Sequence, residues 1–540
     1  MKADKIFFNG NILTMDQKNP EVECLAIKDG KIVFAGSKEE GEEHEGNKTE
    51  AIDLKGRSLV PGFIDSHLHM GVLGMNCSAI DCRYPYVKSI EDIKEKIRER
   101  TETAPPGTWI RGWGYDHSKL EEGRHPNRLD LDQVAPDNPV MITRTCAHIS
   151  TFNSKGLEVA NVNKDTPEIE GGVIERDNEG QPLGVMKENA HMFMMKVAMP
   201  AEEELMQAFR LANDILIREG ITSVHDSGGY GQMQMDVQRK AVEQGVIGIR
   251  INAMVFSFIE NLEFVEEYIK KGLDKQKNPR FKVGPIKLMI DGSSSGPTAA
   301  TLEPYASNPD FSGILSMEPE AVDDIVLQAH QRGHQVTTHA VGDRAVDIIS
   351  SAIEKAVKAH PRKDHRHRIE HCAMVNDDLL DRIERVKILP VPQPIFLYEF
   401  GDGYVRNYGE DRTNRMFTCK SFIDRGILAA GSSDCPITFS NPLMGIHLAV
   451  NRVTQSGAKI SQGERISKME ALKMFTYNGA YASFEEGLKG SLEVGKVADI
   501  VILSEDFTRC SDDSIKDIKV DMTMVDGKIV YERKYHEKEK

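Results

Sequence analysis

Side chains that bind divalent metals stand at the ends of several predicted β-strands. His67 and His69 close the first of them, and the two-residue period of a strand puts both on one face. His339, His371 and Asp434 close three later strands. Four imidazoles and a carboxylate that converge on one place would be costly to bury unless they bind something. A divalent metal, most simply zinc, would satisfy them and would activate water for hydrolysis.

The spacing His-X-His is weak evidence by itself. With 17 histidines in 540 residues, about 0.5 such pairs arise by chance, and a second pair does occur at His365 and His367. That second pair stands in the cationic stretch RKDHRHR, which favours a solvated surface over a metal site. The pair His67 and His69 is stronger evidence for a metal site than His365 and His367, because other ligand-type side chains also fall at the ends of predicted strands.

Lys287 lies inside the apolar run PIKLMID, where a lysine loses its proton, pairs with an acid or is chemically altered. A salt bridge with Asp291 is the simpler interpretation. The alternative is a carbamate formed with carbon dioxide, whose two oxygens would bridge a pair of metals. From these residues alone, both interpretations stay open.

The strands that must position these side chains alternate with amphipathic helical stretches. Helical spacing of apolar residues ends at Gly220 and at Gly333, and a β-branched run follows each glycine. Eight runs are predicted to be strands: residues 58–69, 221–226, 249–256, 285–291, 335–340, 367–372, 387–394 and 427–434. Eight strands close a parallel (β/α)₈ barrel, which carries reactive groups where its strands end. The expected fold class is therefore α/β, with a TIM-like barrel.

Two further parts surround the predicted barrel. Residues 25–36 and 522–533 echo each other as hairpins joined at Asp-Gly, which suggests one β-sandwich built from both ends of the chain. Two unrelated surface hairpins are the alternative. The connection after the first strand is too long for a loop and is predicted to be a domain of its own. The predicted boundaries are 1–57 and 485–540 for the composite β-sandwich, 58–79 and 201–484 for the barrel, and 80–200 for the insertion.

The composition argues against several classes of function. Lys and Arg number 68 against 84 Asp and Glu, so the net charge is −16, and the pI is near 5.6. Nucleic acids and anionic membranes need clustered cations, so a small neutral or cationic ligand is expected instead. No apolar run reaches the ~18 residues of a membrane span, and no signal peptide is evident. A cytoplasmic protein with reduced cysteines is therefore expected.

Four residues are candidates for contact with a substrate. Trp113 and Phe396 would form an aromatic wall for a bulky group, although packing explains most tryptophans. His148 has apolar neighbours in the insertion, which suits a pocket wall and a satisfied core histidine nearly equally. His225 ends the run ITSVHD beside Asp226, where a structural pair and a substrate contact are equally reasonable.

The chain resembles the amidohydrolase superfamily. The resemblance is carried, in order, by LVPGFIDSHLH, KLMIDGSSSGPTA, THAVGDRAVD, HRIEHC and AAGSSDCPI. The runs GWGYDH, AHISTFNSKGLE and GSLEVGKVADIVIL make it similar to one branch in particular, the N-substituted formamide deformylase-like and exoenzyme-regulator-like metal hydrolases. The similarity covers nearly the whole chain. It implies a TIM-like barrel, a composite β-sandwich, the long insertion and one or two divalent metals.

The resemblance also implies a role for each ligand-type residue. The implied metal ligands are His67, His69, Lys287, His339, His371 and Asp434. The first two histidines would hold one metal with the aspartate beside it, the other two would hold a second, and the lysine would bridge them as a carbamate. Asp434 would also serve as general base and acid.

The expected function is hydrolysis of a non-peptide amide by a homodimeric enzyme, with an N-substituted formamide as the substrate class. A cyclic amidase or an amidine-type deaminase would use the same metal site. A catalytically silent regulatory or binding protein on the same scaffold is the alternative from another class. The intact ligand set speaks against that alternative.

Overall fold

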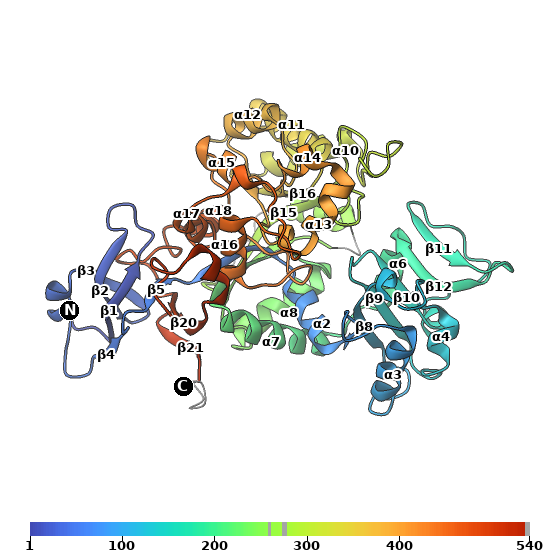
Figure 1. The fold of residues 1–540 in the computed structure, drawn as a ribbon, viewed down its shortest axis with the longest axis horizontal. Helices are drawn as coiled ribbons and strands as arrows, with labels where there is room; N and C mark the ends of the chain where they lie inside the picture. Colours follow the sequence, from blue (N-terminus) through green and yellow to red (C-terminus); the bar gives the residue numbers. More distant parts are fainter. Residues whose placement is uncertain (258–260, 273–277, 535–540) are drawn as a thin grey trace.

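The computed structural model describes residues 1–257, 261–272 and 278–534. At its centre is a sheet of seven parallel strands, each paired with the next strand of the sheet in chain order (Figure 1). These strands are β6 (Phe63–Leu68), β13 (Ile221–Asp226), β14 (Arg250–Val255), β15 (Phe281–Met289), β16 (Val336–Ala340), β17 (Arg368–His371) and β18 (Leu389–Val391). Because all seven are parallel, their carboxyl ends share one rim. The predicted α/β class is confirmed.

The predicted eighth strand, residues 427–434, does not form a regular strand. Its backbone nevertheless spans the gap in the sheet. The amide of Ala430 donates to the carbonyl of Pro390 (3.1 Å), and the amide of Ser66 donates to the carbonyl of Gly431 (3.1 Å). The barrel sheet is therefore nearly closed, with an irregular segment in the eighth position. The run GSSD lacks the β-branched residues that favour a regular strand, which accounts for the difference.

Amphipathic helices cover the barrel, as their apolar spacing predicts. α7 (Glu202–Arg218) buries Leu205, Phe209 and Leu216, and each such side chain contributes about 1.5–3 kcal/mol when fully buried. Gly220 follows this helix with a left-handed φ of +79°, the conformation that ends many helices. No helix in the described part of the chain is long and apolar enough to cross a membrane. The other covering helices are α8 (Gly231–Glu243), α9 (Asn261–Lys271), α10 (Pro319–Gln331), α11 (Asp343–Ala359), α12 (Asp377–Val386), α13 (Phe396–Tyr408) and α16 (Pro442–Asn451).

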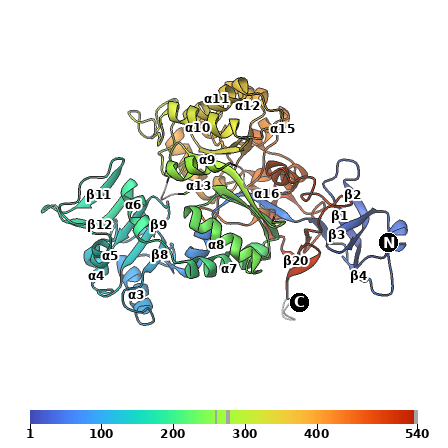
Figure 2. The ribbon, with the colours of Figure 1, turned by 180° about the vertical axis from the view of Figure 1, so that it is seen from behind.

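Strands from both ends of the chain form one sheet on the side of the barrel away from the insertion (Figures 1 and 2). The link is the antiparallel pair β5–β19, in which Val60 faces Val501. This pairing joins the strands from both ends of the chain into a single composite sheet. The predicted sandwich, which requires two facing sheets, is not confirmed. The strands are β1 (Lys5–Leu13), β2 (Glu21–Lys28), β3 (Lys31–Gly36), β4 (Glu50–Asp53), β5 (Ser58–Pro61), β19 (Ile500–Leu503), β20 (Val520–Val525) and β21 (Lys528–Glu532).

Both predicted Asp-Gly hairpins are present. Asp29 and Gly30 join β2 to β3, Asp526 and Gly527 join β20 to β21, and all four residues have left-handed φ angles. The two turns meet at Ala498. Its amide donates to the carbonyl of Gly30 (2.8 Å), and its carbonyl accepts from the amide of Gly527 (2.9 Å). The hairpins therefore belong to one sheet, at the two ends of its strand order, and are not unrelated surface features.

The insertion carries a six-stranded sheet of its own, on the right in Figure 1. α3 (Ile90–Thr101) buries Ile93 and Ile97 against this sheet in a separate apolar cluster. The predicted domain boundaries stay a prediction, and residues 535–540 of the C-terminal part lie outside the described residues. The strands are β7 (Ile80–Asp81), β8 (Ile110–Tyr115), β9 (Val140–Arg144), β10 (Ile149–Phe152), β11 (Gly172–Arg176) and β12 (Pro182–Glu188).

The prediction that His365 and His367 lie on a solvated surface is wrong. Both are buried, with 4% and 0% of their surface exposed. Nε2 of His367 lies 2.8 Å from Nδ1 of His330, and Nε2 of His365 donates to the carbonyl of Val386 (2.9 Å). A neutral imidazole donates and accepts at once, so these rings satisfy polar groups at the foot of β17 instead of facing water.

Arg250 on β14 fastens the composite sheet to the barrel. Its side chain is buried, and its guanidinium donates to both carboxylate oxygens of Asp499 (2.7 and 3.2 Å). It also donates to Asp526, in the turn of the C-terminal hairpin. One buried cation thus joins a barrel strand to two segments from the end of the chain.

We expect Arg250→Ala to lower the free energy of unfolding by about 3–5 kcal/mol, because Asp499 would be left buried without its cation. Denaturant-induced unfolding measures the change. The control is Arg98→Ala on the exposed side of α3, for which a change within about 0.5 kcal/mol is expected. An Arg250 variant as stable as the parent would show that this ion pair does not hold the sheet.

Candidate metal centre

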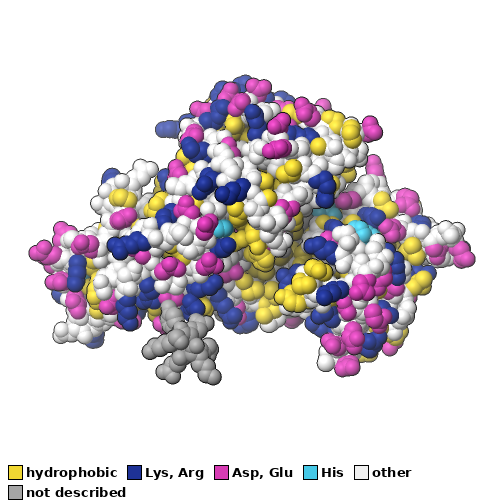
Figure 3. Space-filling model, in the orientation of Figure 1, with side chains coloured by type: hydrophobic (Ala, Val, Ile, Leu, Met, Phe, Trp, Pro, Cys, Tyr) yellow, Lys and Arg dark blue, Asp and Glu magenta, His cyan; other side chains and the backbone are white. Residues whose placement is uncertain are grey.

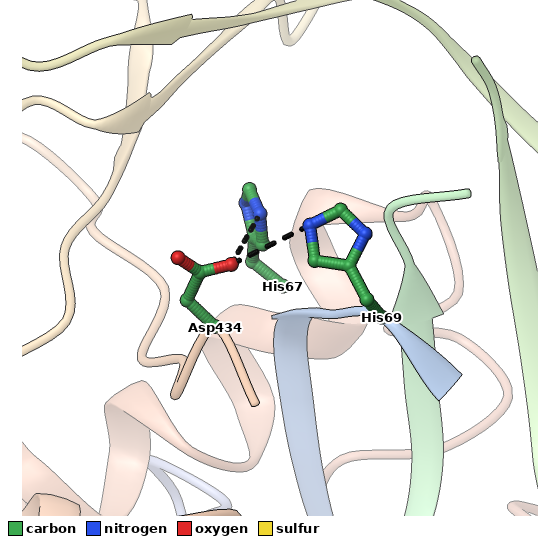
Figure 4. A group of neighbouring side chains, drawn as sticks. All are labelled: His67, His69 and Asp434. Carbon is green, nitrogen blue, oxygen red and sulfur yellow. Dashed lines mark ion pairs between the residues drawn. The ribbon is translucent and has the colours of Figure 1, made fainter. Parts of the chain in front are cut away.

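Three side chains meet at the carboxyl end of the barrel strands (Figure 4). Nε2 of His67 lies 3.2 Å from one carboxylate oxygen of Asp434, and Nε2 of His69 lies 3.5 Å from the same oxygen. One ligand atom from each residue lies within 4.8 Å of the others, and all three residues are buried. Two imidazoles and a carboxylate at this spacing fit the ligand set of a divalent metal.

The local backbone brings these side chains together. His67 lies within β6 and His69 follows it, so the alternation of the strand turns both toward the cavity. Asp434 comes from the irregular segment in the eighth position, where its amide donates to the carbonyl of His67 (2.7 Å). Its φ of +58° is left-handed, which costs a non-glycine residue about 1–3 kcal/mol. The surrounding contacts must offset that cost.

The other predicted ligands adjoin this trio. The rings of His339 and His371 are centred 4.4 Å apart, and those of His67 and His371 are centred 5.1 Å apart. Nζ of Lys287 lies 3.5 Å from Nε2 of His67. The structure thus gathers all six side chains that the sequence nominated as ligands, although they come from four strands and the 427–434 segment.

Three of the imidazoles are held from behind by a hydrogen bond from the other ring nitrogen. The pairs are Nδ1 of His69 with the Gly228 carbonyl (2.8 Å), Nδ1 of His371 with Oε1 of Gln393 (2.7 Å), and Nε2 of His339 with the Gly292 carbonyl (3.1 Å). A ring nitrogen that donates outward leaves the opposite nitrogen with a free lone pair. That tautomer is the one that binds a metal.

His67 is held in the same way by Glu370, a residue that the sequence analysis did not nominate. The carboxylate of Glu370 accepts from Nδ1 of His67, from the hydroxyl of Thr337 and from the guanidinium of Arg368 (2.8 and 3.1 Å). Strand periodicity could have found it, because Arg368 and Glu370 stand two apart and face the same side of β17. His371 reaches the cavity for a different reason, its left-handed φ of +67°.

Burial sets the protonation of the cluster. It lowers the pKa of all four imidazoles, to about 3 for His69 and His339, because the charged ring loses its hydration. The rings are therefore neutral at pH 7, the form that metals bind. Burial likewise lowers the pKa of the Lys287 amine and raises the pKa of the Asp434 carboxyl.

Lys287 and Asp291 do not form the salt bridge that the sequence suggested as the simpler interpretation. The carboxylate of Asp291 accepts instead from the backbone amides of Ala300 (3.0 Å), Val341 (3.0 Å) and Gly342 (2.9 Å). These bonds tie the loop after β15 to the start of α11. Asp291 is thus a structural residue, and the carbamate interpretation of Lys287 stays open.

Two chambers meet at the ligand cluster, between the barrel and the insertion. Apolar side chains gather in this hollow (Figure 3). The apolar chamber, of about 160 Å³, is bordered by Met75, Trp113, Met141, Met192 and Met195, among others. The more polar chamber, of about 200 Å³, is bordered by Arg144, Ser293, Ser295 and Phe396, among others. Both chambers share His148, His339, His371 and Asp434.

Three of the four predicted substrate contacts border these chambers. Trp113 borders the apolar one, Phe396 the polar one and His148 both. His225 does not border either chamber. It is fully buried in β13, where its Nδ1 accepts from the guanidinium of Arg368 (2.9 Å). This placement favours the structural interpretation of His225, and its contact with substrate stays a prediction.

The fold and the ligand cluster define a class of protein that comparison with known families confirms. The model of the amidohydrolase family matches residues 50–531. The chain therefore belongs to the amidohydrolase family.

Individual relatives cover nearly all of the chain. It is 31% identical to the putative amidohydrolase YtcJ of Bacillus subtilis (strain 168), over 99% of this chain and 100% of that one. It is 28% identical to the N-substituted formamide deformylase of Arthrobacter pascens, with 98% of each chain covered. A crystal structure of an uncharacterized metal-dependent hydrolase from Pyrococcus horikoshii OT3 superposes with a TM-score of 0.79 at 28% identity, covering 94% of this chain and 99% of that one. The protein is a hydrolase that acts on C–N bonds.

We expect Glu370→Gln to weaken metal binding by about 10–100-fold, because the outward partner of His67 loses its charge and its fit to Arg368. Metal content after dialysis against a graded chelator series measures the affinity. Glu203→Gln, in the exposed first turn of α7, is the matched control and should bind metal like the parent. Unchanged affinity in the Glu370 variant would remove this carboxylate from the support of the site.

Proposed function

We propose that the protein hydrolyses a non-peptide amide, with an N-substituted formamide as the substrate class. The observation that carries the proposal is the convergence of His67, His69 and Asp434 on one buried point, with two further imidazoles beside it. The formamide is suggested by similarity to the deformylase. The apolar chamber supports it, since apolar walls favour an alkyl or aryl substituent on the nitrogen.

The proposed cofactor is zinc, as one or two ions held by His67, His69, Lys287, His339, His371 and Asp434. Neutral imidazoles with outward hydrogen bonds, next to a carboxylate, fit such an ion. When bound, the metal would acidify a water molecule and polarise the carbonyl under attack. A carbamate on Lys287 is part of the proposal, because a lowered pKa favours the uncharged amine that reacts with carbon dioxide.

Asp434 is the proposed general base. Its carboxylate lies against Nε2 of His67 and of His69, so a water molecule at the cluster is within its reach. In the simplest scheme the same carboxyl group returns the proton to the departing nitrogen. Burial raises the pKa of Asp434, which favours the protonated form once the proton has been accepted.

The proposal includes a homodimer that works in the cytoplasm on a small molecule, without nucleic-acid or membrane partners. A cyclic amidase or a deaminase would use the same groups on a different substrate. A silent regulatory scaffold is disfavoured, because every ligand-type side chain is present and supported from behind. Substrate trials separate these alternatives.

We expect Asp434→Asn to keep its metal and to lose turnover by about 10²–10⁴-fold, because the amide oxygen can still face a cation but the side chain cannot accept the proton. Metal content and initial rates are measured on the same sample. Asp424→Asn, on the exposed side of the barrel, should match the parent in both. Unchanged turnover in the Asp434 variant would exclude this residue as the base.

We expect metal-loaded protein to release formate and amine from N-benzylformamide, and to release less from unsubstituted formamide, which cannot fill the apolar chamber. Removal of the metal with a chelator should abolish both activities, and zinc should restore them. Ammonia release from cyclic amidines instead would favour a deaminase. If the protein is purified without metal and stays inactive after metal is added, the silent scaffold would be favoured.

A further inference from the structure

The insertion contains a second histidine–carboxylate pair, and its histidine, His148, borders the chambers at the ligand cluster. Nδ1 of His148 lies 2.9 Å from Oε2 of Glu188. Their backbones are also joined, since the amide of Glu188 donates to the carbonyl of His148 (3.0 Å). Nδ1 is occupied by the carboxylate, so Nε2 is the ring nitrogen left for a ligand.

The sheet of the insertion positions both residues of this pair. His148 directly precedes β10 and Glu188 ends β12, and these strands are antiparallel neighbours. Glu188 and Ala147 both adopt left-handed φ angles, of +49° and +61°. This conformation costs energy in a non-glycine residue, so other contacts must hold it in place. Such residues cluster at functional sites.

A buried ring secures the same corner. His191 of α6 (Asn189–Val197) is 3% exposed and hydrogen-bonds to the backbone of Ala147, the residue before His148. His191 borders the apolar chamber. Its Nδ1 has no hydrogen-bond partner among the described residues, so the ring keeps an acceptor free there.

His148 lies at the junction of the two chambers, where the proposed function places the bond that is cleaved. It borders both chambers, as do the three ligand candidates His339, His371 and Asp434. A carbonyl carbon at the ligands, with its nitrogen substituent in the apolar chamber, places the amide nitrogen at this junction. The His148 side chain is 27% exposed, so it can exchange protons with water.

From this geometry we infer that His148, positioned by Glu188, is the proton donor to the nitrogen that leaves. The inference rests on the proposed function and transfers the second proton step from Asp434 to the insertion. The water oxygen forms a bond to the carbonyl carbon while Asp434 takes its proton. The C–N bond then breaks, its electron pair stays on nitrogen, and the proton on Nε2 of His148 moves to that nitrogen. The Glu188 carboxylate accepts from Nδ1 and so orients the protonated ring beforehand. Afterwards Asp434 releases its proton to solvent, and His148 takes one up from solvent.

The test compares two leaving groups. Benzylamine from N-benzylformamide is strongly basic and leaves only with a proton, whereas 4-nitroaniline from N-(4-nitrophenyl)formamide is weakly basic. We expect His148→Gln to reduce turnover of the first substrate by about 10²–10⁴-fold and turnover of the second by less than about tenfold. Glu188→Gln should show the same bias with a smaller loss, because the neutral amide still orients the ring.

Metal content and the thermal unfolding midpoint are measured on each variant, and His44→Gln in the N-terminal part of the chain is the matched control. In all three variants, metal content and the thermal unfolding midpoint should equal those of the parent. Equal losses on the two substrates, or loss of metal in the His148 variant, would overturn the inference while leaving the proposed function intact. A parent enzyme that cleaves neither formamide would refute the proposed function, and the inference with it.

Discussion

The site depends on one electrostatic constraint. Three buried imidazoles, a fourth that is partly buried, an amine and two carboxylates lie together at the mouth of a barrel, where few charges survive without compensation. Each ring meets the constraint by donating its outer proton to the scaffold, so its inner nitrogen keeps a lone pair. Glu370 meets it differently, by taking hydrogen bonds from Arg368, Thr337 and His67 at once. The barrel strands β6, β16 and β17 are therefore joined by the same contacts that orient the ligands.

The parts of the molecule divide the work accordingly. Parallel strands carry five of the six ligand candidates within or directly after them, because the carboxyl ends of such strands share one rim; the irregular segment 427–434 carries the sixth, Asp434. The insertion supplies part of the walls: Trp113, Met141 and His148 border the cavity from a separate sheet, and Glu188 holds His148. None of the described residues of the composite sheet borders either chamber. This sheet stabilises the barrel from the opposite side, through the buried contacts of Arg250.

Much of this architecture follows from local sequence. Strand-end position was enough to nominate five of the ligand candidates, whereas the ligand role of Lys287 came from the family resemblance. Asp-Gly was enough to place both hairpins. Three features were not predictable in the same way. Residues 427–434 complete the barrel without strand geometry, and His371 reaches the cavity only through a left-handed residue. The burial of His365 and His367 depends on His330, whose proximity arises only when the chain folds.

The pairing of β5 with β19 has a consequence for how the chain is made. Val60 and Val501 are partners in the sheet, yet a ribosome releases the first long before the second. Until the last segment emerges, β5 presents an unpaired edge, and such edges recruit foreign strands. The nascent polypeptide must keep that edge from aggregating for nearly the whole of translation, so completion of the sheet is a late step of biogenesis.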